Sequence, residues 1–260
     1  RHAAVYWHRA AADRGRHREA RATSLTEQAI VGDCLLVNGG RTEMENKKLI
    51  ERFEAELAKV DRPGVDKLLA YIRKSDFYTA PASTRFHLSC PNGLLQHSLN
   101  VLDALRGLLS WNEGTQKWEY RVAGHVVDST PDESVIIMAL LHDLCKTHFY
   151  GTSMRNVKNE ETGVWEKKPY YIVDDKMPLG HGDKSVLLAG KYIELSCQEL
   201  YAIWHHMGYS GQDYSAAQAI DHSILKYPMV LALQTADMMA SKLLEGDDSN
   251  RFESTATSVE

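Results

Sequence analysis

The chain has 260 residues, with 30 lysines and arginines against 35 aspartates and glutamates, which gives a formal net charge of −5. This balance provides no general attraction to nucleic acid or to an anionic membrane surface. No apolar run approaches the ~20 residues that a membrane-spanning helix needs. The length fits one large domain or two small ones. The four cysteines are scattered without a C-x-x-C pair, so we expect reduced thiols in a cytoplasmic protein.

Residues 1–43 differ in composition from the rest of the chain. They contain seven of the fifteen arginines and no lysine. Three explanations compete: a translated leader or added extension with the natural start at Met44, a disordered native tail, and an organelle transit peptide with a similar Arg-rich, acid-poor composition. We favour the first and exclude the segment from the fold. A single domain over residues 44–260 is therefore expected, with its core at about residues 93–245.

Helical periodicity begins at Asn46. Apolar residues at 3.6-residue spacing predict a first helix to about Val60, a second that opens at Pro63, and a third over residues 93–110. Thr130, Pro131 and Glu133 then form the pattern of an N-cap, a first-turn proline and a capping box. They predict a central, mostly apolar helix over about residues 131–148.

The second half of the chain changes pattern twice. Residues 153–175 read as a β-hairpin with a Gly-containing turn, too short to be a domain and suited to cover a site. Further helices are expected just after His181 and over residues 198–207, where Gly208 is a C-cap. The last strong helix opens at Pro228, and a polar tail follows.

Seven polar residues lie in apolar or glycine-flanked settings, in or beside separate predicted helices. They are His97, His142, Asp143, His181, His205, His206 and Asp237. Each has a structural explanation by itself: a lone histidine at a core edge is more often hydrogen-bonded than a ligand, and an adjacent His–Asp pair can be a structural hydrogen bond. Together they favour a metal site. Imidazole and carboxylate ligands suit Mn, Fe, Co, Ni or Zn better than Ca, and Mg is possible if water completes its shell.

Three motifs resemble the HD-domain superfamily of metal-dependent phosphohydrolases. They are GLLQHS at residues 93–98, LHDLCK at residues 141–146 and AD at residues 236–237. They match the family pattern H…HD…D in order, over roughly residues 93–244. Periodicity and resemblance together predict an all-α fold, an HD-domain helical bundle with one small β-hairpin insertion.

The resemblance also implies a binuclear site with two divalent transition metal ions. Family members with two ions add two histidines between the HD pair and the last aspartate, and His181 and one of His205 and His206 occupy that interval. We prefer His206 as the ligand, with His205 facing the substrate, although spacing does not decide between them. Asp143 would bridge both ions. The expected metal ligands are His97, His142, Asp143, His181, His206 and Asp237.

The implied chemistry is phosphoester hydrolysis. Two ions ~3.5–4 Å apart bind a phosphoryl oxygen and lower the pKa of a bridging water, and the resulting hydroxide attacks phosphorus. Lys146 lies on the same helical face as the HD pair and is expected to neutralise phosphate charge, unless it is simply a solvated lysine at a helix end. Lys184, at a helix start just past His181, is a second candidate for phosphate contact. The expected catalytic residues are thus Asp143, Lys146 and His205.

The resemblance leaves three classes of function open. The first is a phosphomonoesterase or phosphodiesterase that acts on a nucleotide or a related small phosphate ester. The second is an oxygenase with a mixed-valence di-iron centre that cleaves a C–C or C–P bond, because its ligand set is nearly the same. The third is a non-catalytic domain with a relic site. Residues 207–210 do not match the GYP motif of cyclic-dinucleotide phosphodiesterases, and no nucleic-acid-binding module or membrane partner is indicated.

Overall fold

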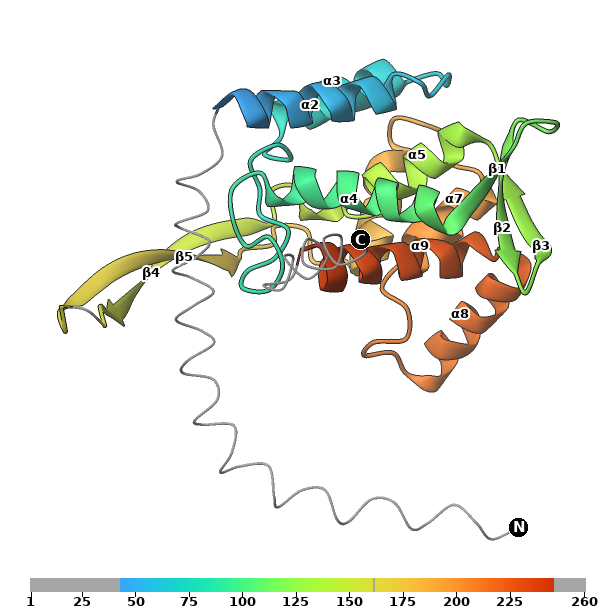
Figure 1. Ribbon diagram of the computed structural model, residues 1–260. Coiled ribbons are helices and arrows are strands. Elements are labelled where there is room, and N and C mark those ends of the chain that lie inside the picture. Colours follow the sequence, from blue (N-terminus) through green and yellow to red (C-terminus); the bar gives the residue numbers. More distant parts are fainter. Residues whose placement is uncertain (1–42, 161, 246–260) are drawn as a thin grey trace, which may run out of the picture. The chain divides into compact units, whose positions relative to one another are not determined.

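The computed structural model describes residues 43–160 and 162–245. Their α-helices (Figure 1) are α2 (Glu43–Leu57), α3 (Val65–Lys74), α4 (Gly93–Leu108), α5 (Asp132–Leu141), α6 (His181–Gly190), α7 (Cys197–His205), α8 (Tyr214–Lys226) and α9 (Met229–Met239). A 3-10 turn, η1 (Leu144–Lys146), follows α5, and a π-helical turn, η2 (Ala240–Leu244), follows α9. The predicted N-terminal extension lies outside the described residues except for Glu43, and so does the predicted polar tail after Glu245.

Helices α4, α5 and α9 contribute most of the buried apolar core. Figure 1 shows α4 and α9 side by side, and α4 also packs along α5. Every residue of α5 from Ser134 to Leu141 is buried, which is expected of a helix that is apolar all round. Within the described part of the chain, no helix combines the length and the apolar character that crossing a bilayer requires.

The central helix differs from its prediction at both ends. Pro131, rather than Thr130, is the N-cap of α5, and no side chain caps it, so the predicted capping box is wrong. The helix ends at Leu141 instead of about His148. The backbone leaves the helical conformation at Asp143, whose φ and ψ are −104° and 20°. The HD pair therefore lies at the end of a buried helix.

Two small antiparallel sheets accompany the helices. The predicted hairpin is confirmed as β4 (Tyr150–Lys158) paired with β5 (Trp165–Val173). The second sheet, which was not predicted, consists of β1 (Leu109–Asn112), β2 (Lys117–Val122) and β3 (His125–Thr130). A mostly helical fold with a hairpin insertion is therefore correct, but a purely helical remainder is not.

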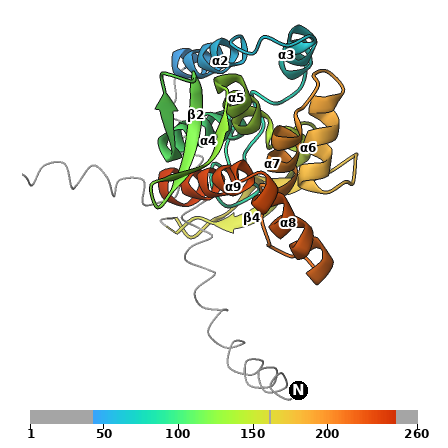
Figure 2. The same cartoon turned by 90° about the vertical axis from the view of Figure 1, so that its right-hand side faces the viewer.

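The start of α6 approaches the end of α7 closely, as Figure 2 shows from the side. Gly182 makes this possible, because a Cβ at this position would lie 1.9 Å from the carbonyl oxygen of Trp204. The absence of a side chain at this glycine therefore allows α6 to pack closely on α7. It brings the first turn of α6 against the segment that carries His205 and His206.

A buried ion pair anchors the N-terminus of α7. Ser196 and Glu199 form a reciprocal capping box, the arrangement that satisfies two otherwise unpaired N–H groups at a helix start. The Glu199 carboxylate is fully buried and accepts two hydrogen bonds of 2.7 Å from Arg62, which also contacts Glu133. Arg62 precedes α3, so this pair ties the N-terminal helices to α7.

We expect Glu199→Gln to lower the free energy of unfolding by about 3 kcal/mol, because it leaves part of the buried Arg62 charge uncompensated. Urea denaturation followed by circular dichroism measures the change. Glu51→Gln is the matched control, since Glu51 pairs with Lys47 at 3.8 Å on an exposed helix face and should cost less than about 0.5 kcal/mol. Equal effects of the two substitutions would contradict the assigned role of Glu199.

The same carboxylate predicts acid sensitivity. Burial raises the pKa of Glu199, but the hydrogen bonds from Arg62 and Ser134 outweigh it and hold the pKa below the ordinary 4.5. Its stabilisation is therefore complete above the unfolded pKa and is lost as the pH falls through the lowered folded pKa. Below pH 4.5, the unfolding free energy of the wild type should fall more steeply than that of Glu199→Gln. Parallel curves in pH-dependent urea denaturation would contradict this prediction.

Candidate metal centre

Five of the predicted ligands converge between α4, α5, α7 and α9. We refer to them as the His–Asp cluster: His97, His142, Asp143, His206 and Asp237. The Nε2 atom of His97 lies 3.2 Å from Nε2 of His142 and 3.2 Å from Oδ1 of Asp237. Asp143 Oδ2 is 3.5 Å from His97 Nε2 and 3.4 Å from His142 Nε2, while its Oδ1 is 3.6 Å from His206 Nε2. All members except Asp237, which is partly exposed, are buried.

The backbone around His142 and His206 fixes the direction of both imidazoles. His142 Nδ1 lies 2.8 Å from the carbonyl oxygen of Ala139, and His206 Nδ1 lies 2.7 Å from that of Ile203. A carbonyl only accepts hydrogen bonds, so each Nδ1 carries the proton and each Nε2 presents a lone pair to the cluster. The Nε2 of His206 is buried without a hydrogen-bond partner among the described residues, which calls for a ligand there.

A carboxylate fixes His97 in the same way. Both oxygens of Glu245 lie 3.0 Å from His97 Nδ1, and Asn100 Nδ2 donates to Glu245 Oε1 at 2.8 Å. A carboxylate behind an imidazole is the usual outer partner of a metal-bound histidine, because it sets the ring orientation and strengthens the ligand. Glu245 was not among the predicted site residues.

The donor atoms have the spacing that one ion requires. Nitrogen and oxygen ligands bound at ~2.0–2.2 Å around one ion lie roughly 3–3.6 Å from each other. Five donor–donor separations within the His–Asp cluster are 3.2–3.6 Å. His97, His142, Asp143 and His206 therefore can hold a metal ion. Imidazoles with carboxylates favour Mn, Fe, Co, Ni or Zn.

The charges in the cluster are strongly coupled to each other. Burial lowers the pKa of His97, but hydrogen bonds with Asp237 and Glu245 outweigh it and raise the pKa to about 9. Burial raises the pKa of Asp143, but the Lys146 ammonium and the His142 imidazole hold it well below its usual range. The carboxylates are thus ionised and ready to bind a cation.

Lys146 contacts the cluster directly. Its Nζ donates to Asp143 Oδ2 at 2.6 Å and to the carbonyl oxygen of Ala82 at 2.7 Å. Tyr150 Oη, on the hairpin, donates to the same carbonyl at 3.0 Å. The ammonium is therefore held beside Asp143 rather than in solvent, and its two described hydrogen bonds leave one N–H for another acceptor.

His181 lies at the edge of the cluster rather than inside it. Its Nδ1 is 3.2 Å from Cys145 Sγ, and Cys145 Sγ is 3.9 Å from Asp143 Oδ1. Asp143, Cys145 and His181 form a separate group whose ligand atoms lie within 4.8 Å of one another. Burial lowers the pKa of His181, which keeps the imidazole neutral at pH 7. Burial and the charge of Asp143 raise the pKa of the Cys145 thiol to about 12.

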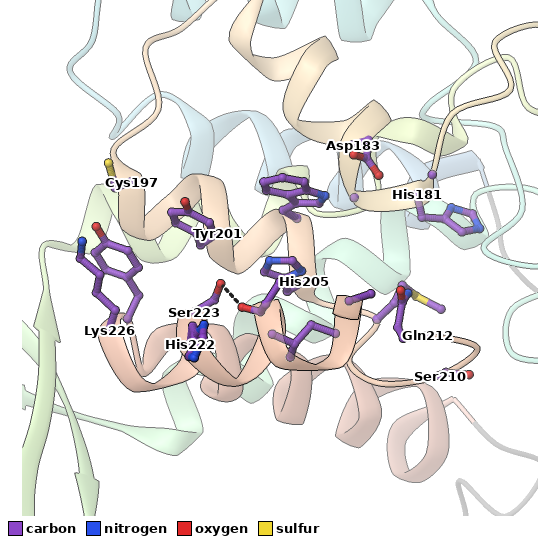
Figure 3. Close-up of a pocket in the computed structure, with 18 residues that line it drawn as sticks. His181, Asp183, Cys197, Tyr201, His205, Ser210, Gln212, His222, Ser223 and Lys226 are labelled. Carbon is purple, nitrogen blue, oxygen red and sulfur yellow. Dashed lines mark hydrogen bonds between the residues drawn. The ribbon is translucent and has the colours of Figure 1, made fainter. Parts of the chain in front are cut away.

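His205 faces a different space from its neighbour His206. It lines a cavity of about 890 Å³ between α6, α7 and α8, and Figure 3 shows His181 at one end of this cavity and Lys226 at the other. The rings of Tyr201, Trp204 and His205 are nearly parallel, with interplanar angles of 9–20°. Sequence spacing did not decide which of these two histidines is near the other ligands. The structure places His206 in the cluster and His205 in the cavity wall.

Lys184 is placed differently from Lys146. It is buried on α6, its Nζ lies 2.5 Å from Asp175 Oδ1, and the ring of Phe149 lies 5.2 Å away. It does not line the cavity. Its contact with a phosphate stays a prediction, and it requires the pair with Asp175 to open.

Sequence reasoning missed several residues that contact the cluster, among them Glu245, Cys145 and His87, whose ring centroid lies 4.9 Å from that of His97. Glu245 is separated from His97 by 148 positions and ends a π-helical turn, so no periodicity links them. Cys145 lies within the LHDLCK motif, but the sequence predicted only that it is a reduced thiol. No protein family, no curated protein and no solved structure that we compared with this chain matches it.

Proposed function

We propose that this chain is an HD-domain metal-dependent phosphohydrolase that acts on a nucleotide or a related small phosphate ester. One observation carries the proposal: buried imidazole nitrogens and carboxylates from four helices converge, with a buried lysine ammonium beside them. Imidazoles and carboxylates in such a cluster bind divalent metal ions, and the neighbouring ammonium can bind a phosphate group beside those ions.

The side chains of the cluster would hold the metal ions in place, and the ions would act as Lewis acids. When bound, divalent metal ions at this cluster would neutralise phosphoryl charge and activate a water for attack. His97, His142 and Asp237 would be metal ligands on one side of the site, and Asp143 would be a ligand at its centre. Lys146 donates a hydrogen bond toward Asp143 from the hairpin side, where it can also contact a phosphoryl oxygen that gains charge in the transition state.

The cavity beside the cluster supports a nucleotide over a smaller ester. Its wall on α7 consists of the near-parallel rings of Tyr201, Trp204 and His205, and Tyr227 stacks on Tyr201 at 5.4 Å. Aromatic rings in parallel are a platform on which a planar base can stack. His181 lines one end of this cavity and contacts Cys145, which in turn contacts Asp143. We therefore propose that the base of the ligand lies in the cavity and its phosphate at the cluster.

The test is a panel of phosphate mono- and diesters, assayed with protein loaded separately with Mn, Co, Ni, Zn or Mg. Hydrolysis of a nucleotide, abolished by a chelator and restored by metal, is the expected result. Inactivity toward the whole panel with metal bound would overturn the proposal. Iron in the purified protein, with oxygen consumption in place of phosphate release, would instead establish the oxygenase alternative.

We expect Trp204→Ala to raise KM about tenfold for a nucleotide and to leave KM for glycerol phosphate unchanged, because stacking contributes about 1–3 kcal/mol per base. Steady-state kinetics with both substrates measure this difference. Trp111→Ala is the control: Trp111 is a comparably exposed tryptophan on β1 and does not line the cavity. Equal effects on both substrates would show that Trp204 does not contact a base.

A further inference from the structure

Asp143 faces two different sets of ligands with its two oxygens. Oδ2 faces His97, His142 and Lys146. Oδ1 faces His206 Nε2 at 3.6 Å and Cys145 Sγ at 3.9 Å. A carboxylate in this position can bind one ion through each oxygen.

The atoms on the Oδ1 side include a sulfur. Cys145 Sγ is 3.2 Å from His181 Nδ1, and the ligand atoms of Asp143, Cys145 and His181 lie within 4.8 Å of one another. Sulfur and nitrogen bound to one tetrahedral ion at ~2.3 and ~2.0 Å are roughly 3.6 Å apart. The spacing is thus close to that of two ligands of one ion.

A second observation points to a ligand at this place. His206 Nε2 is buried and has no hydrogen-bond partner among the described residues, and it lies on the Oδ1 side of Asp143. His181, by contrast, is only partly buried and lines the cavity. The group thus combines buried protein ligands with one side open to the cavity, which is how a catalytic metal site differs from a structural one.

The backbone holds Cys145 toward this group. Its N–H donates to Ser185 Oγ on α6 at 3.0 Å, and α6 begins at His181. The ring of Phe149 packs against His181 with centroids 5.6 Å apart. Both ends of the Cys145–His181 contact are therefore positioned by packing.

We propose that Cys145 is a thiolate ligand of a second metal ion, bound together with Asp143 Oδ1 and His181 Nδ1. This inference rests on the metal cluster of the proposed function and adds the ligand that sets the choice of metal. A thiolate selects zinc, cobalt or iron over the harder magnesium and manganese. The thiol proton is released to solvent when the ion binds. The ion on the Oδ2 side, with only nitrogen and oxygen ligands, should discriminate less.

The test is cobalt(II) titration of the full chain, followed by absorption spectroscopy. A thiolate bound to cobalt gives an intense charge-transfer band in the near ultraviolet, which nitrogen and oxygen ligands do not give. We expect the band in the wild type at about two equivalents of cobalt, and its loss in Cys145→Ser. Serine replacements of Cys34, Cys90 and Cys197 should each retain it.

Metal competition gives a second readout. Cys145→Ser, which replaces a soft ligand with a hard one, should lower the preference of the protein for zinc over manganese about 10–100-fold. A wild-type spectrum without the band at full cobalt loading would overturn the inference, whatever the variants do. So would a band that persists in Cys145→Ser. The band without hydrolysis of any phosphate ester would refute the proposed function only, and hydrolysis without the band would refute the sulfur ligand only.

Discussion

Asp143→Asn is expected to weaken metal binding about 100-fold or more and to reduce phosphoester hydrolysis at least 1000-fold, roughly the range seen when a single key catalytic group is removed. The amide keeps the shape of the side chain but removes the negative charge that faces the imidazoles on both sides. It also leaves only one oxygen as a metal ligand. Metal content per chain after dialysis, together with turnover of the best substrate, measures both effects.

The control for this substitution is Asp128→Asn. Asp128 is a half-buried carboxylate outside the cluster, and it accepts hydrogen bonds from Gln198 and from the backbone N–H of Met229. We expect this variant to keep its metal, although it loses some stability. If Asp143→Asn kept the metal content of the wild type, Asp143 would be a structural carboxylate and the proposed centre would be wrong.

The main helices could be predicted from the sequence because they bury an apolar face or are apolar throughout. The sheet formed by β1–β3 and the helix α8 could not. The strands β1–β3 are mostly exposed on both faces, so they have no apolar alternation to read. In α8, only Ile220 and Ser223 are buried, which leaves no apolar stripe. The early end of α5 was also missed, because its apolar run continues into η1 with Leu144 and Cys145 buried.

The spatial grouping of the predicted ligands could be anticipated because each is a polar residue in an apolar setting. A buried histidine or aspartate needs a partner, so several of them indicate one shared site. The residues that were missed include Cys145 beside Asp143 and the partners of His97 and Lys146. Glu245 comes from the end of the described chain, and the carbonyl of Ala82 comes from the loop before α4. Backbone carbonyls and distant carboxylates leave no local pattern in the sequence.

Lys146 is the residue for which a catalytic and a structural role predict opposite results. Its ammonium lies 2.6 Å from the Asp143 carboxylate. Burial alone would lower the pKa of Lys146, but the charge of Asp143 raises it, so the lysine stays charged. An ion bound to Asp143 is repelled by this ammonium. Removing the charge should therefore leave metal affinity unchanged or increase it.

We expect Lys146→Met to lower kcat about 100-fold or more while the metal content is retained, because the variant lacks a cation beside the phosphoryl group as charge develops. Steady-state kinetics and metal analysis on one preparation give both values, and Lys146→Arg should restore part of kcat. Arg106→Met is the control, since Arg106 is a half-buried cation that pairs with Glu56 and Asp132 away from the cluster.

The opposite pattern would assign Lys146 a different role. If kcat were unchanged and metal affinity increased in Lys146→Met, the ammonium would only balance the charge of Asp143 when no ion is bound. If metal were lost together with activity, Lys146 would act by holding the loop at Ala82 in place. Lys146 and Tyr150 both donate a hydrogen bond to the carbonyl oxygen of Ala82. Tyr150→Phe separates this case, because it removes one of the two donors to that carbonyl and keeps the lysine. Metal retained in Tyr150→Phe, with low turnover only in Lys146→Met, would leave charge neutralisation at the phosphate as the function of the lysine.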